Sequence, residues 1–257
     1  MNSVLVGRRV DRAAVYVGLS GVTVVAWVVT VQLAAGMRTP AESMDMAAAM
    51  PSIGWQFLFT AAMWAAMMVG MMVPSATPMV VAYAEWTRRG PSNGRRVVAV
   101  ASFLAGYLIV WLGFSLLAAT LHVALQRAEL ITEMGAVARP ALGGTLLLLA
   151  GLFQITTWKQ SCLRSCRTPF GFLIEQWRDG NRGAVVMGIR HGAYCLGCCW
   201  LLMATLFVVG TMHLAWMAAI ALFVLAEKVA PRWLHVGHAG AVVLVGWGAW
   251  TLLTAGN

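Results

Sequence analysis

Seven stretches of this chain contain no Asp, Glu, Lys or Arg and are long enough, or nearly so, to cross a lipid bilayer as a helix, which takes about 20 apolar residues. Because 60% of the residues are hydrophobic and only 11% are charged, the chain cannot cover itself with polar surface, which excludes soluble enzymes, disordered segments and secreted disulfide scaffolds. The sequence therefore predicts an all-α polytopic membrane protein with about seven transmembrane helices in a single domain over residues 1–257. The stretches are Ala13–Ala35, Trp55–Ala84, Val97–Leu121, Ala141–Trp158, His191–Gly210, Met212–Ala226 and Ala239–Ala255.

The basic residues predict the orientation of these helices, because Lys and Arg concentrate in short loops on the cytoplasmic side of a membrane. With the N-terminus in the cytoplasm, 15 of the 18 basic residues fall inside, and only Arg38, Arg127 and Arg139 fall outside. An odd number of spans then places the C-terminus outside. The sixth stretch is short and closely follows the fifth, so six spans with one re-entrant segment are the alternative. The net charge of +9 thus reflects topology, and we expect the lipid bilayer, and no nucleic acid, as a partner.

The longest polar connection, residues 159–190, is predicted to be a cytoplasmic loop. Within it, residues 170–177 (Phe-Gly-Phe-Leu-Ile-Glu-Gln-Trp) have the pattern of a short amphipathic helix that lies at the membrane interface. No other polar segment is long enough to fold as a separate soluble domain, and the sequence indicates no oligomeric state.

Methionine is concentrated in and before the second apolar stretch, where nine of the 16 methionines lie between residues 44 and 79. Thioether sulfur is a soft, neutral ligand that suits Cu(I) and places no charge within the bilayer. The sequence therefore predicts a ladder of copper ligands here, with packing of a flexible apolar side chain as the alternative. At 100° per residue, the candidates on the helix form two neighbouring columns, Met63, Met67 and Met71 in one and Met68, Met72 and Met79 in the other, preceded in the outer loop by Met44, Met46 and Met50.

Pro74 and Pro78 interrupt the same helix in its inner half, because a proline lacks the amide donor and displaces the carbonyl four residues earlier. The carbonyls freed in this way are those of Gly70 and Pro74. Membrane helices tolerate such breaks where the freed carbonyls face protein or a watered cavity. We expect Ser75 and Thr77 to satisfy them locally.

All five cysteines fall near the predicted cytoplasmic ends of the fourth and fifth stretches, and the last three lie one to two turns inside the membrane. Thiols stay reduced on the cytoplasmic side, so structural disulfides are not expected. Their spacings suit soft metals and dithiol redox chemistry. Two pairs can form a tetrahedral four-thiolate site, and nearby basic residues (Lys159, Arg164, Arg167 and Arg190) are expected to favour thiolates. Redox chemistry and simple packing are the alternatives. The candidate metal ligands are Cys162, Cys166, Cys195, Cys198, Cys199 and, one turn before Cys195, His191.

Three motifs occur in order along the chain: Ala-Met-Met-Val-Gly-Met-Met-Val-Pro-Ser-Ala-Thr-Pro-Met at residues 66–79, Trp-Lys-Gln-Ser-Cys-Leu-Arg-Ser-Cys-Arg-Thr-Pro at 158–169 and Gly-Ala-Tyr-Cys-Leu-Gly-Cys-Cys-Trp at 192–200. In combination they resemble a bacterial family of predicted metal-binding integral membrane proteins, a domain of unknown function. The resemblance runs from about Gly54 to Leu253. It implies a polytopic membrane protein with a metal site. We expect this protein in the bacterial cytoplasmic (inner) membrane.

The remaining histidines are weaker candidates, because no two have the i, i+4 spacing of a two-histidine metal site. His122 and His213 lie near outer helix ends and are predicted as further outer ligands. Glu85 and Glu227 lie beside basic residues at inner helix ends, which predicts ion pairing or snorkelling. No acidic or basic residue is central in a span, so we expect no carrier for a proton relay.

These features predict a protein that binds a soft metal ion, with copper as Cu(I) the leading candidate and zinc the alternative. The outer methionines would collect the ion, the methionine columns would pass it on, and the cysteines would receive it, for transport or for hand-over to a metallochaperone or metalloenzyme. The alternatives are a non-catalytic accessory subunit that assembles a membrane or periplasmic metalloenzyme, and a thiol–disulfide redox membrane enzyme. The chain carries no hydrolase, kinase, nucleotide-binding or zinc-protease motif, so a catalytic role is not the leading expectation.

Overall fold

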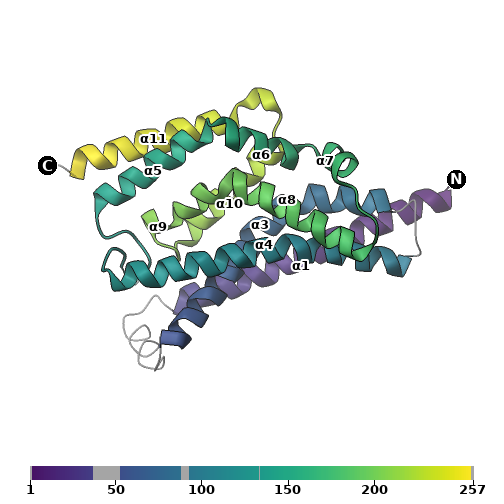
Figure 1. Cartoon of the computed structure of the whole chain (residues 1–257), viewed down its shortest axis with the longest axis horizontal. Helices are drawn as coiled ribbons and strands as arrows, with labels where there is room; N and C mark the ends of the chain where they lie inside the picture. The colour runs from purple at the N-terminus through teal and green to yellow at the C-terminus, as the bar shows by residue number, and fades with distance from the viewer. Residues whose placement is uncertain (1, 37–52, 88–92, 133, 256–257) are drawn as a thin grey trace.

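The computed structural model describes residues 2–36, 53–87, 93–132 and 134–255, which are helical almost throughout (Figure 1). In those ranges there is no β-strand, only an isolated bridge between Ile131 and Val137. The predicted all-α fold is therefore confirmed. The helices are α1 (Asn2–Gly36), α3 (Ile53–Trp86), α4 (Asn93–Arg127), α5 (Pro140–Gln154), α6 (Thr157–Arg167), α7 (Pro169–Gln176), α8 (Gly180–Ala204), α9 (Leu206–Val209), α10 (Leu214–Val229), the 3-10 helix η2 (Arg232–Leu234) and α11 (Val236–Ala255).

All seven predicted stretches lie on helices, but fewer qualify as complete membrane crossings. Five segments of the described chain are long and apolar enough to span a bilayer, namely α1, α3, α4, α8 with α9, and α11. α5 and α6 meet the same criterion only together, and a bend of 62° separates them, so they form a broken span or a re-entrant segment. α10 has only 16 residues. Length and composition thus support five or six crossings.

α3 and α8 form the centre of the bundle. In their most apolar windows 56% and 50% of the residues are buried, against 17% to 22% for α1, α4 and α11, whose outer faces expose large apolar side chains as lipid contact requires. α4 packs along α8, and α1 packs along α3, where Arg12 and Glu85 form an ion pair. α5 and α11 lie side by side as a pair, on the opposite side of the molecule from α1 (Figure 1).

The bend between α5 and α6 has a local cause. Thr156 leaves the helix and caps α6, since its Oγ1 accepts a hydrogen bond from the Lys159 amide at 3.3 Å. α6 then buries Lys159, Cys162, Leu163 and Cys166, which recur at the three- and four-residue intervals of one helical face. Because α6 packs on α8, the bend brings its two cysteines to the centre of the bundle.

The loop predicted over residues 159–190 is in fact mostly helical. α6 and α7 occupy much of it, and α8 begins at Gly180, eleven residues before the predicted start of the span at His191. The prediction placed that start too late because Arg182 and Arg190 interrupt the uncharged part of the sequence. Both are exposed on α8, where a charged side chain does not interrupt a helix.

The segment predicted as a short amphipathic helix coincides with α7. Phe172 and Leu173 are buried in the bundle, whereas Phe170 and Ile174 are exposed. The helix therefore has one face toward the protein and one away from it, and its place at the membrane interface stays a prediction.

Candidate functional site

The six methionines of the α3 columns all lie in the interior of the bundle. None is more than 4% exposed, and all belong to one cluster of buried apolar side chains. Packing accounts for this burial, so metal binding by the columns stays a prediction. The outer-loop residues Met44, Met46 and Met50 lie outside the described residues. The columns comprise Met63, Met67, Met68, Met71, Met72 and Met79.

α3 runs as one continuous helix through Pro74 and Pro78, and the carbonyl that Pro74 displaces finds its partner on a neighbouring helix. The Gly70 carbonyl, which Pro74 leaves without its helical donor, accepts a hydrogen bond from Trp27 Nε1 on α1 at 3.1 Å. The local partners predicted from the sequence were wrong. The hydroxyls of Ser75 and Thr77 donate instead to the carbonyls of residues 72 and 73, at 2.9 and 3.2 Å. A helical hydroxyl reaches a carbonyl three or four residues earlier, so Ser75 cannot reach Gly70, and Thr77 bonds to residue 73 and not to Pro74.

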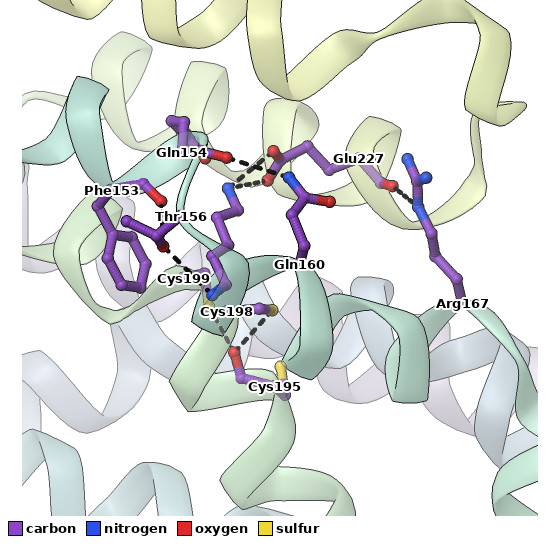
Figure 2. Close-up of polar contacts among 10 residues, drawn as sticks. Phe153, Gln154, Thr156, Gln160, Arg167, Cys195, Cys198, Cys199 and Glu227 are labelled. Carbon is purple, nitrogen blue, oxygen red and sulfur yellow. Dashed lines mark hydrogen bonds and ion pairs between the residues drawn. The ribbon is translucent and has the colours of Figure 1, made fainter.

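Four of the five thiols meet where α6 packs on α8. The Sγ atoms of Cys198 and Cys199 both donate to the Cys195 carbonyl at 3.0 Å (Figure 2). The side chain of Cys166, on α6, interacts with those of Cys195 and Cys198 across the α6–α8 interface. All are buried and free of disulfides. We call these four residues, Cys166, Cys195, Cys198 and Cys199, the thiol cluster.

Cys162 lies beside the thiol cluster. Its Sγ would be only 2.9 Å from a Cβ atom at position 197, so Gly197 leaves the space that this thiol needs. No three Cys, His, Asp or Glu side chains of the described chain are arranged to hold a metal ion, so the tetrahedral four-thiolate site stays a prediction. A reason is that Cys198 and Cys199 direct their thiols to the backbone carbonyl of Cys195.

The cysteines of α8 lie well inside their helix. Because α8 begins at Gly180, Cys195 is fifteen residues, or about 22 Å, from the start of its helix. The hydroxyl of Tyr107, on α4, connects Cys195 to α3. Its oxygen lies 3.1 Å from the Met72 carbonyl and 3.2 Å from Cys195 Sγ. Cys195 therefore lies beside the middle of α3, and its depth in the membrane stays a prediction.

A buried lysine that the sequence reasoning missed completes the surroundings of Cys195. Lys228 Nζ, on α10, donates to Cys195 Sγ at 3.0 Å and to Ser75 Oγ at 2.8 Å. The prediction assigned Lys228 to a cytoplasmic loop because it follows an apolar stretch, yet it is only 7% exposed. The available signal was the shortness of the sixth stretch, because α10 continues past its predicted end at Ala226 to Val229.

The basic residues predicted to favour thiolates have other partners or face outward. Lys159 Nζ binds both carboxylate oxygens of Glu227, at 2.7 and 2.8 Å, which confirms the ion pairing expected for this acid. Arg167 Nε donates to the Glu227 carbonyl (Figure 2), and Arg164 and Arg190 are exposed. The cation at the thiol cluster is instead the lysine of α10. Lys159, Glu227 and Lys228 are buried near the ends of α6 and α10, and the expectation that no charged residue is central in a span stays a prediction.

The histidines predicted as ligands lie in different surroundings. His191 stacks on Tyr107 with ring centroids 5.7 Å apart and meets Phe172 edge-on. Neither of its ring nitrogens has a hydrogen-bond partner in the described chain, although it is 1% exposed. His213 instead caps α10, and His122 is buried in the core, so their role as outer ligands stays a prediction.

Comparison with known families supports a role in copper handling. A family model described as "Copper chaperone" (PpoB2) matches residues 61–251, about three quarters of the chain, which includes the α3 methionines and all five cysteines. The match confirms the resemblance drawn from the three sequence motifs. No curated protein and no solved structure matches the chain.

Proposed function

The chain belongs to this copper chaperone family, and from that premise we propose that it binds Cu(I) at the thiol cluster and hands the ion to a recipient protein. Copper handling in general follows from the family, whereas the site and the hand-over are our proposal. The observation that carries it is the meeting of thiols from α6 and α8 beside the methionine-rich middle of α3.

The donor atoms favour Cu(I) over zinc. Thiol and thioether sulfur are soft ligands that select Cu(I), whereas structural zinc takes four ligands in a tetrahedron. Among the described side chains no such set is arranged around a common point. Cu(I) is stable with only two soft ligands, and Cys166 and Cys195, whose side chains interact across the α6–α8 interface, are the pair we assign to it.

The methionine columns of α3 offer soft ligands along a path to the thiol cluster. The path begins at Met63 and reaches the level of Cys195 at Met72, where the Tyr107 hydroxyl contacts both residues. Thioethers carry no charge, so they can stabilise a monovalent ion inside the membrane without adding buried negative charge. We therefore propose that copper moves between the columns and the thiols.

Hand-over of copper also covers the role of an accessory subunit that assembles a metalloenzyme. The recipient of the copper is then a metalloenzyme or a metallochaperone. Transport across the membrane is the competing function. Uptake of Cu(I) into sealed proteoliposomes separates the two, since a hand-over protein releases copper only to an acceptor.

Serine replacement of both Cys166 and Cys195 is expected to abolish high-affinity Cu(I) binding, because a hydroxyl is a hard and poor ligand for this ion. The measurement is an anaerobic titration of the purified full-length protein in detergent against a chromophoric Cu(I) chelator. Circular dichroism of the same sample establishes that the helices are retained. Wild-type affinity in the folded double variant would show that copper does not use the thiol cluster.

Leucine replacement of Met67, Met71 and Met72 is expected to keep the fold but to slow Cu(I) loading severalfold. Leucine and methionine have similar volumes, so each exchange costs less than about 1.5 kcal/mol, but the soft ligands are lost. Stopped-flow transfer of Cu(I) from a chelator measures the rate. The control is Met217→Leu, which replaces a methionine buried on α10 outside the columns. Equal rates in the two variants would assign the columns to packing alone.

A further inference from the structure

The ammonium group of Lys228 is buried without a carboxylate partner. Its Nζ contacts one sulfur, Cys195 Sγ at 3.0 Å, and one hydroxyl, Ser75 Oγ at 2.8 Å. The adjacent residue Glu227 directs its carboxylate to Lys159, and among the described side chains no acid lies within ion-pair distance of Lys228. Because an uncompensated buried charge is costly, the thiol cluster is the group positioned to balance it.

The position of Lys228 relative to the thiols is fixed by three helices. Ser75, on α3, accepts from Lys228 and donates to the Met72 carbonyl at 2.9 Å. Tyr107, on α4, contacts the same Cys195 sulfur at 3.2 Å. Ser75, Tyr107 and Cys195 are each at most 4% exposed, so neither water nor salt screens the lysine from the sulfur as they would at a surface.

We propose that Lys228 makes the thiol cluster selective for a monovalent over a divalent metal ion, an inference that rests on the proposed function. Two thiols that bind a metal ion release their protons to solvent. Two thiolates with Cu(I) carry one negative charge, which Lys228 neutralises. The same two thiolates with Zn(II) are already neutral, and the ammonium group then stays as an uncompensated positive charge. Lys228 thus stabilises the Cu(I) complex and destabilises the Zn(II) complex.

The test is the ratio of Cu(I) to Zn(II) affinity, measured on purified full-length protein by anaerobic competition with chelators for each metal. Lys228→Met is expected to lower this ratio roughly a hundredfold, because it removes a unit charge next to the metal ligands at a buried site. Lys228→Arg keeps the charge and is expected to restore most of the selectivity. Arg164→Met removes an exposed cation from α6 and is expected to leave the ratio unchanged.

Circular dichroism establishes that each variant is folded, and Lys228→Gln, which can still bond to Ser75, is a second neutral variant. A wild-type ratio in a folded neutral variant that binds Cu(I) would overturn the inference and leave the proposed function intact. Wild-type protein that binds no Cu(I) would remove the proposed function itself. A hundredfold fall in Arg164→Met would show that net charge, and not Lys228, sets the selectivity.

Discussion

Replacing Gly188 with alanine is expected to destabilise the protein by about 3 kcal/mol, the upper end of what overpacking costs. A Cβ atom at position 188, on α8, would overlap the Phe103 carbonyl oxygen on α4 and lie 3.0 Å from the Tyr107 amide nitrogen. Gly106, on α4, meets the Val185 carbonyl in the same way. Because the obstructing atoms belong to the backbone, no change of rotamer relieves the overlap, and the two helices must separate.

The free energy of unfolding, measured by SDS titration in detergent micelles, checks this expectation. Gly113→Ala is the matched control on α4, because no atom of another helix lies within 4 Å of its Cβ position. It is expected to keep or gain stability, by up to about 1 kcal/mol from helix propensity. Since Tyr107 and Cys195 meet across the same interface, Gly188→Ala is also expected to weaken Cu(I) binding. Equal stability of the two variants would mean that the fold does not depend on this close approach.

The existence of the helices could be predicted because apolar content is a property of contiguous residues. The sequence did not predict whether an apolar stretch forms one straight helix, since that depends here on one capping interaction. Thr156 closes the first turn of α6 and turns the chain by 62°, whereas the sequence there reads as a polar break of a few residues at the end of an apolar run. Helix ends were also misplaced, because exposed arginines lie well inside α8.

The sulfur ligands of the candidate site could be found because they form clusters along the chain, but their polar surroundings could not. Tyr107 and Lys228 lie 88 and 33 residues from Cys195, and Ser75 lies 153 residues from Lys228. A lysine at the end of an apolar stretch is expected to extend its ammonium group to the lipid headgroups, since that is the usual conformation of such a lysine. Only the packing of α10 against α3 and α8 turns Lys228 inward to a thiol.

Replacing Lys159 with methionine is expected to destabilise the fold by about 3–5 kcal/mol, because it leaves a carboxylate buried without its cation. The side chains of Lys159 and Glu227 are 0% and 2% exposed, so solvent does not compensate for the loss. The pair joins α6 to α10, and α6 carries Cys162 and Cys166. SDS titration in detergent measures the change in the free energy of unfolding, and Cu(I) titration shows whether the cysteines of α6 are displaced with it.

The double variant Lys159→Met with Glu227→Leu separates the ion pair from the packing of α6. Apolar residues of similar size often replace a buried ion pair without loss of stability, so the double variant is expected to recover most of the stability that the single variant loses. The Arg167 guanidinium bonds to the backbone carbonyl of residue 227, which neither substitution removes, so α6 keeps this tie to α10. A double variant as unstable as the single one would place the loss in the packing of the lysine stem and not in the stranded carboxylate.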